Sequence, residues 1–266
     1  MIAKANFTLV FGFLSSTLLF WAAPFPAQST PENCPEIKIN GAADWYPVIM
    51  RKETDGNSQE GIQGLAPDIT REISRRLGIP LKITPKSTWN RVLSQLEKGE
   101  LDMLLGAYWT PERAQIYSYT KPVTTDEVAI FVRKGDEASY KELGDLVGRK
   151  GLRPMGGSYG KDFDQFASRH LSILEVPTEN LIEMLAAGRA DYVVLARYDG
   201  IADVHETENT KNITPLSWNI ASNDVYFMIS KASPCHALLE DINRIILELH
   251  DEGFIKNLEA RYAYFN

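Results

Sequence analysis

The chain is an acidic polypeptide of 266 residues, with a formal net charge of −7 and 44% hydrophobic residues. A chain of this length and composition buries a substantial core and is too long for one small domain, so two lobes fit. Nucleic acid is not an expected partner, because binding its phosphates needs a basic stripe and none is evident in the sequence.

The N-terminal segment 1–29 predicts a secretory signal peptide. It begins with one lysine, Lys4, continues through an apolar run at 7–20 and ends in small residues and prolines. Cleavage is expected after Ala27 or at the small-x-small motif that ends at Ser29. No cysteine follows the apolar run directly, which argues against a lipoprotein. The segment therefore predicts a periplasmic protein, with an uncleaved membrane anchor as the alternative.

Aromatic residues follow the first predicted strand. Residues 37–40 alternate in polarity, and Trp45 and Tyr46 lie just beyond the carboxyl end of this strand. Aromatic side chains at that place either stack on a ligand or cover the core of a lobe. Trp89, at the start of a later predicted helix, leaves the same two alternatives open.

One spacing, Leu-x-x-Gly-x-x-Asp, occurs twice, at 96–102 and 185–191, and an apolar run follows each copy. Each copy reads as a helix, a glycine C-cap and a strand. Two such units predict two similar α/β lobes, and open α/β sheets bind ligands beyond the carboxyl ends of their strands. The segments Gly106-Ala-Tyr108 and Ala196-Arg-Tyr198 would then face each other across a cleft. The alternative is that Gly-x-x-Asp is a common pattern at the ends of helices and carries no further meaning.

Arg113 occupies an unusual place at a helix start. Thr110 suits the N-cap, Pro111 the first helical position and Glu112 the first turn, so Arg113 falls at the positive end of the helix dipole. Either a neighbouring carboxylate compensates this cation or the site receives an anion. A guanidinium at a helix N-terminus is a good carboxylate clamp.

Five segments occur together in a specific order and spacing. They are Gly61-Ile-Gln-Gly-Leu-Ala-Pro-Asp-Ile69, Trp89 ahead of Leu96-x-x-Gly99-x-x-Asp102, Thr110-Pro-Glu-Arg113, Thr120-Lys-Pro122 and Gly188-Arg-Ala-Asp191. From about Ile37 to the C-terminus the chain resembles the bacterial extracellular solute-binding proteins of family 3, the polar-amino-acid type of ABC uptake systems.

This resemblance implies an α/β fold of the type II periplasmic-binding-protein kind, with two Rossmann-like lobes and a hinge. Lobe 1 is expected at 30–132 and 220–266, and lobe 2 at 133–219. The implied function is capture of a small carboxylate-bearing solute, an amino acid or related organic acid, in the interlobe cleft. The resemblance further implies a monomer that closes on its ligand and presents it to a membrane ABC permease.

The resemblance also implies a ligand site without catalytic residues or cofactors. The expected site residues are Arg113, Gly106, Tyr108, Ser158, Tyr159, Trp45, Tyr46, Trp89 and Arg197. Arg113 would hold the carboxylate, and Ser158 and Tyr159 either donate hydrogen bonds to it or belong to a plain turn. Arg197 is either a second anion contact or a surface arginine paired to Asp199 or Asp203.

Two positions depart from the family pattern. Amino-acid binders usually carry an aspartate for the α-ammonium where this chain has Ala196, and Tyr108 replaces a smaller hydroxyl residue. A buried cation without a counter-anion is unfavourable, so binding of ordinary α-amino acids requires that Asp44, Glu175 or Asp199 substitutes.

The two cysteines predict a disulfide between Cys34 and Cys235, because an even count in an exported protein favours one. In the family topology the chain returns to lobe 1 near its end, where the two residues can meet. Buried free thiols are the alternative. The histidines are scattered with no ligand pair at helical spacing, so no metal site is expected.

Two other function classes stay open beside a solute-binding protein that is not an enzyme. Cyclohexadienyl dehydratases resemble this fold, and Glu175 is the acid that such an enzyme would use. A sensory protein that reports ligand occupancy to a membrane receptor is the other class. The sequence has no recognisable docking motif that would separate it from a transport protein.

Overall fold

The computed structural model describes residues 1, 33–41, 45–52, 61–84 and 87–262. The predicted signal peptide, apart from Met1, and Asp44 lie outside the described residues. None of the helices in the described ranges is both long and apolar enough to cross a membrane.

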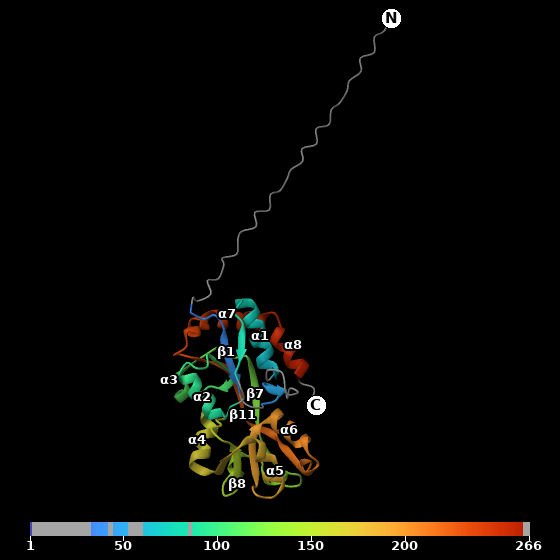
Figure 1. Cartoon of the computed structure of the whole chain (residues 1–266). Helices are drawn as coiled ribbons and strands as arrows, with labels where there is room; N and C mark the ends of the chain where they lie inside the picture. Colours follow the sequence, from blue (N-terminus) through green and yellow to red (C-terminus); the bar gives the residue numbers. More distant parts are fainter. Residues whose placement is uncertain (2–32, 42–44, 53–60, 85–86, 263–266) are drawn as a thin grey trace.

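Within the described residues, one mixed sheet of nine strands runs through two lobes (Figure 1). The order is β4-β1-β5-β11-β7-β10-β8-β9, and β6 pairs with β11. The strands are β1 (Ile37–Gly41), β4 (Leu81–Ile83), β5 (Met103–Tyr108), β6 (Tyr117–Tyr119), β7 (Thr124–Arg133), β8 (Lys150–Pro154), β9 (Ser172–Val176), β10 (Tyr192–Ala196) and β11 (Ile213–Ser230). A separate ribbon pairs β2 (Met50–Lys52) with β3 (Gly61–Gln63).

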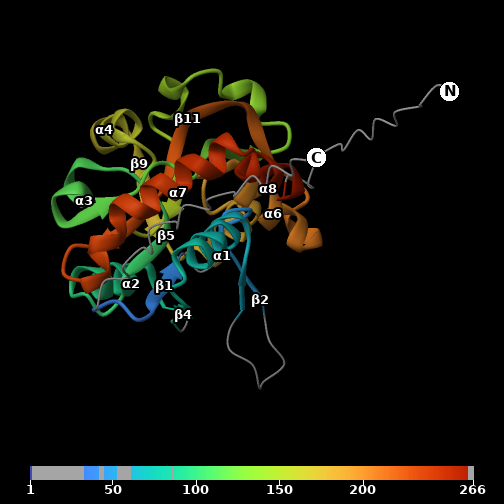
Figure 2. The same cartoon turned by 90° about the horizontal axis from the view of Figure 1, so that it is seen from above.

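The helices divide between the lobes (Figure 1). Lobe 1 carries α1 (Leu65–Leu77), α2 (Trp89–Glu97), α3 (Pro111–Ile116), α7 (Leu239–Asp251) and α8 (Phe254–Tyr262). Lobe 2 carries α4 (Lys161–His170), α5 (Leu181–Ala186) and α6 (Arg197–Glu206). Helices α1, α7 and α8 pack against one another on lobe 1 (Figure 2). The predicted two-lobed α/β fold is therefore confirmed.

The two Leu-x-x-Gly-x-x-Asp segments form matching units, one in each lobe. Gly99 has φ +74° and Gly188 has φ +72°, so each glycine ends its helix in the left-handed conformation. Asp102 at the start of β5 accepts a hydrogen bond from the backbone of Lys38 at 2.7 Å. Asp191 before β10 accepts the equivalent bond from Lys150 at 2.8 Å. Each aspartate thus fixes the start of one parallel strand pair, and the predicted likeness of the lobes is confirmed.

Two long strands, β7 and β11, connect the lobes. The first part of β7 pairs with β11 at Thr124↔Val225, whereas Val128 to Phe131 also pair with β10 of lobe 2. The chain therefore passes between the lobes inside a continuous strand pair. The boundaries predicted at 132/133 and 219/220 fall within these two strands, and their position stays a prediction.

The predicted disulfide between Cys34 and Cys235 is confirmed. The two Cα atoms lie 5.1 Å apart, and both residues are almost fully buried. The bond fastens the segment before β1 to the short turn of helix that precedes α7. It therefore ties the first described segment of lobe 1 to the last helices of the same lobe.

Candidate functional site

Arg113 lies where the two lobes meet. Thr110 caps α3 by accepting the backbone N–H of Arg113 at 3.2 Å, as the sequence predicts. The side chain then extends back from the helix, and its guanidinium donates to the Tyr108 carbonyl of lobe 1 and the Gly156 carbonyl of lobe 2, each at 3.3 Å. The guanidinium carbon lies 5.4 Å from the centre of the Trp89 ring. The predicted clamp therefore contacts both lobes.

The surroundings of Arg113 supply no negative charge by direct contact. Within the described ranges, no aspartate or glutamate forms an ion pair with Arg113, and its hydrogen-bond partners are the two carbonyls and the Tyr119 hydroxyl, all of them neutral. Asp164 acts on Arg113 only at longer range. Burial lowers the pKa of Arg113 from its ordinary value. The indole Nε1–H of Trp89 is also buried, and no acceptor for it exists among the described residues. A charged donor and an unsatisfied neutral donor thus lie side by side, an arrangement suited to an anion.

Tyr108 and Trp45 both hydrogen bond to a buried carboxylate that sequence reasoning missed, Asp126 on β7. The Tyr108 hydroxyl donates to Asp126 Oδ2 at 2.6 Å, and Trp45 Nε1 donates to the same oxygen at 2.9 Å. The two rings meet edge to face, with centroids 5.2 Å apart. Burial raises the pKa of Asp126 to about 6, although both hydrogen bonds favour its ionised form.

Contacts from lobe 2 complete the junction. The Tyr46 backbone N–H donates to Asp199 Oδ1 of α6 in lobe 2 at 2.9 Å. The Tyr46 hydroxyl donates within lobe 1, to the Tyr262 carbonyl at 2.6 Å. The buried Tyr159 ring lies 6.2 Å from the Tyr108 ring. Tyr108 therefore packs between Trp45 of lobe 1 and Tyr159 of lobe 2.

The glycine turn of lobe 2 uses its predicted donors within the chain. The Ser158 hydroxyl donates to Asp164 of α4 at 2.5 Å, and the Tyr159 backbone N–H donates to the same carboxylate at 3.2 Å. The Tyr159 hydroxyl donates to the Val194 carbonyl at 3.2 Å. This arrangement favours the plain-turn interpretation of Ser158 and Tyr159, because their donors already have acceptors.

Glu175 is also engaged within lobe 2. It accepts hydrogen bonds from the Gly156 backbone at 3.1 Å and from Arg153 at 2.5 Å. The Gly156 bond, followed by Arg153, lowers the pKa of Glu175. An ionised, paired carboxylate is a poor general acid, so the geometry does not favour the catalytic role considered for Glu175.

Arg197 forms hydrogen bonds with β11, one of the two strands that connect the lobes. Its guanidinium donates to Asn219 Oδ1 at 2.7 Å and to the Leu216 carbonyl at 2.8 Å. Glu127 lies 3.5 Å from Nε and supplies a counter-charge. These bonds favour the structural interpretation of Arg197 over a second anion contact, with Glu127 as an unexpected partner.

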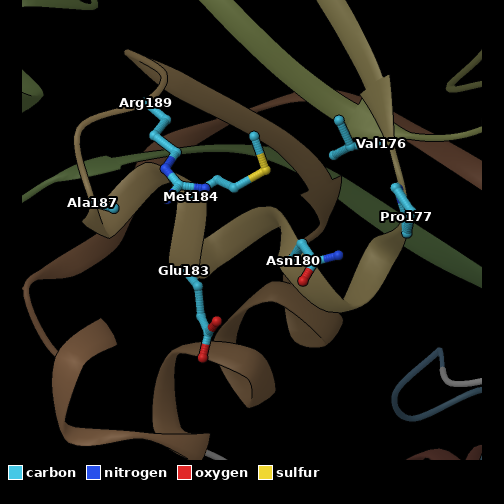
Figure 3. Close-up of a pocket in the computed structure, with 7 residues that line it drawn as sticks. All are labelled: Val176, Pro177, Asn180, Glu183, Met184, Ala187 and Arg189. Carbon is cyan, nitrogen blue, oxygen red and sulfur yellow. The ribbon is translucent and has the colours of Figure 1, made fainter.

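A surface pocket of about 430 Å³ lies elsewhere on lobe 2 (Figure 3). Its lining comes from the end of β9, the following turn, α5 and the residues just after α5. The lining residues are Val176, Pro177, Asn180, Glu183, Met184, Ala187 and Arg189. No predicted site residue lines this pocket, and it is separate from the Arg113 junction.

Comparison with known proteins assigns the chain to a family. The bacterial extracellular solute-binding proteins, family 3, match residues 37–265. The chain belongs to this family. The L-cystine-binding protein TcyJ of Escherichia coli strain K12 is 21% identical over 227 residues, 84% of this chain and 80% of that protein. Membrane-bound lytic murein transglycosylase F of Idiomarina loihiensis is 24% identical over 144 residues, 50% of this chain and 30% of that protein.

Two solved structures resemble this solute-binding protein. A mutant of ArgBP from T. maritima has a TM-score of 0.71 at 25% identity and covers 86% of this chain and 95% of its own. A histidine kinase sensor domain with similarity to periplasmic binding proteins also has a TM-score of 0.71 at 25% identity, over 85% and 95% of the two chains. The fold and the family predicted from the sequence are therefore confirmed.

Gly106 of this solute-binding protein permits the close approach of Trp45 to β5. Its φ is +86°, and a Cβ at this position would lie 3.0 Å from Trp45 Cζ3 and 3.2 Å from Val48 Cγ1. Gly148 has a similar φ of +79° but no atom within 4 Å of the corresponding Cβ position. Gly106 thus combines a backbone requirement with a packing requirement.

Gly106→Ala is expected to destabilise the protein by more than Gly148→Ala. Both variants carry a backbone cost of about 1–3 kcal/mol, and Gly106→Ala adds the contact with Trp45. Urea unfolding of the three proteins measures this difference. Equal losses of unfolding free energy in the two variants would show that the contact between Trp45 and the added Cβ at position 106 costs nothing.

Asp126 predicts a pH-dependent difference between the ligand-free wild type and Asp126→Asn. The pKa of about 6 in the folded state lies above the ordinary aspartate value. The stabilisation that this group provides is therefore fully present below about pH 4 and is lost as the pH rises through about 6. Relative to Asp126→Asn, the wild type should lose about 2–3 kcal/mol over this window. Urea unfolding at pH 4 and pH 7 tests this, and a difference that is constant with pH contradicts it.

Proposed function

We propose that this protein captures a small carboxylate-bearing solute, an amino acid or related organic acid, between its lobes for ABC-type uptake. In this proposal it acts as an exported, periplasmic monomer, and the closed form is presented to a membrane permease. The observation that carries the proposal is the junction of Arg113 and Trp89. There, a partly buried guanidinium that forms no ion pair with a carboxylate in the described part of the chain lies beside an unsatisfied indole N–H.

The position of this junction also supports the proposal. Arg113 contacts carbonyl groups of both lobes, so a carboxylate bound there would favour the closed state over the open state. The amino acid named for the relative TcyJ has a carboxylate of the kind that a guanidinium recognises.

A thermal-shift screen of the exported protein tests the proposal. The panel contains amino acids, other organic acids, amines and neutral sugars. A ligand at 100 times its dissociation constant should stabilise the protein by about 2.7 kcal/mol, which is readily visible as a rise in Tm. Responses confined to carboxylates support the proposal. Responses confined to amines or sugars contradict it.

Two alternatives follow from the similar proteins. The likeness to a sensor domain favours a membrane receptor as the partner in place of a permease. A pull-down with the ligand-bound protein separates these roles, because it captures either a permease or a receptor. The transglycosylase relative, whose matched part is less than a third of its length, keeps an enzyme open. Turnover of prephenate, arogenate or murein by the purified protein would establish an enzyme, and ligand binding without turnover would support capture.

A further inference from the structure

The surface pocket of lobe 2 has the size of a small-molecule site. Its volume of about 430 Å³ falls within the range of about 300–1,000 Å³ that is typical of ligand pockets. Every lining residue lies between positions 176 and 189, so lobe 2 alone forms the pocket. A movement of one lobe against the other would therefore leave its lining together.

The pocket lies between α5 and the end of β9, the last strand of the sheet. Its apolar lining is formed by Val176, Pro177, Met184 and Ala187. In Figure 3 the Met184 thioether extends from α5 toward Val176 and Pro177. Methionine sulfur makes favourable contacts with aromatic rings, and a flat ring fits a narrow apolar space of this kind. The apolar part of the pocket is therefore suited to an aromatic group.

Leu174 continues this apolar wall along β9. It lies on the same face of the strand as Val176, because alternate residues of a strand share a face. Its side chain is 60% exposed, which is unusual for a leucine in the middle of a strand. A ligand in the pocket would cover apolar surface that water otherwise contacts, and this burial favours binding.

Arg189 supplies a positive charge at the rim of the pocket. Its side chain is exposed and forms no ion pair within the described residues. The end of α5 does not need this cation, because Arg133 donates to the Leu185 carbonyl at 3.2 Å and the Ala190 carbonyl at 2.7 Å. Glu183 also lines the pocket, but its side chain points away from Arg189 in Figure 3. The Arg189 guanidinium is therefore available to a carboxylate.

We propose that this pocket is a second ligand site for a small aromatic carboxylate. The ring lies between Met184 and the wall of Val176 and Pro177, and the carboxylate binds Arg189. The Asn180 amide, whose side chain has no hydrogen-bond partner among the described residues, is available to a polar substituent on the ring. The inference is independent of the proposed function, because the site includes neither Arg113 nor any residue of lobe 1.

Methyl NMR of the methionines in the exported protein tests the inference. The probes are phenylacetate, 3-phenylpropionate and 4-hydroxyphenylacetate, with acetate and phenylacetamide as analogues that lack the ring or the charge. The Met184 signal is identified by its loss in Met184→Leu. At least one aromatic carboxylate should shift this signal saturably and bind about fivefold or more tightly than both analogues. Arg113→Ala should leave this dissociation constant within about twofold.

Arg189→Gln locates the carboxylate. It should weaken binding of the aromatic carboxylate at Met184 by about fivefold or more and remove the preference over phenylacetamide. Arg169→Gln is the matched control, because Arg169 is another exposed arginine of lobe 2 and lies outside the pocket lining. The control should leave the dissociation constant within about twofold. Both side chains are exposed, so neither change is expected to prevent folding.

Each result distinguishes this inference from the proposed function. If no aromatic carboxylate shifts the Met184 signal saturably, the second site is overturned. Equal binding of phenylacetamide, or equal weakening by Arg169→Gln, overturns the carboxylate contact at Arg189. If Arg113→Ala abolishes the Met184 shift and Arg189→Gln does not, the ligand binds at the lobe junction, and carboxylate capture stands without a second site. A saturable shift that depends on Arg189 supports the inference even where no carboxylate binds at Arg113.

Discussion

Arg113→Ala should weaken binding of a carboxylate ligand by about 30-fold to several thousand-fold, because truncating one partner of a buried, hydrogen-bonded charge pair costs about 2–5 kcal/mol. The guanidinium reaches carbonyl groups of both lobes, so its loss removes the proposed partner of the carboxylate and also a contact between the lobes. Calorimetric titration with a carboxylate that responds in the ligand screen measures the change.

Arg197→Ala is the matched control for that experiment. Arg197 lies beside β7 and β11, the strands that connect the lobes, and Asn219, the Leu216 carbonyl and Glu127 occupy its guanidinium. We expect the control to lower the stability of the hinge while ligand affinity stays within about threefold, because its bonds are internal. If Arg197→Ala loses as much affinity as Arg113→Ala, Arg197 is the second anion contact that the sequence left open.

Replacing the disulfide by serines, in Cys34→Ser with Cys235→Ser, should lower the free energy of unfolding by about 2–5 kcal/mol. The bridge closes a loop with a sequence separation of 201 residues, so its removal greatly increases the freedom of the unfolded chain. In the folded state it joins the segment before β1 to the region before α7.

Urea unfolding with intrinsic fluorescence measures this effect. The wild type in the presence of a reductant should match the double variant, because both lack the same covalent bond. Ligand affinity should change little, since both cysteines belong to lobe 1 and lie outside the Arg113 junction. An unchanged unfolding free energy in the double variant would show that the bridge contributes nothing to stability.

Local patterns in the sequence were sufficient to predict the two repeated helix–strand units. Leucine, glycine and aspartate at fixed spacing specify a helix, its end and the next strand, and both copies form the same backbone hydrogen bonds. The place of Arg113 was predictable for the same reason, because Thr110 and Pro111 define the start of α3 within four residues.

The role of Asp126 could not be predicted in this way. In the sequence, Thr124-Thr-Asp-Glu127 has the appearance of a polar strand start. The residue becomes buried because β7 pairs with β11 at this point and because Trp45, far away in the sequence, reaches the same oxygen as Tyr108. The strand register and a contact between segments that are distant in the sequence determine its environment, and neither leaves a local signal.

Ser158 illustrates a different difficulty. A hydroxyl in a glycine turn is a reasonable ligand donor, but Asp164 lies six residues later in the first turn of α4 and accepts the hydrogen bond of this hydroxyl. An acidic residue near the start of the next helix was the available signal, because such side chains often accept hydrogen bonds from the preceding turn.

The most direct measurement is a thermodynamic cycle with a carboxylate ligand and its carboxamide analogue, titrated into the wild type and Arg113→Ala. The account predicts that the wild type prefers the carboxylate by about 30-fold or more and that Arg113→Ala binds the two within about threefold, because the charge recognised is at Arg113. If Arg113→Ala retains the full preference of the wild type, the carboxylate binds elsewhere and the central claim is wrong.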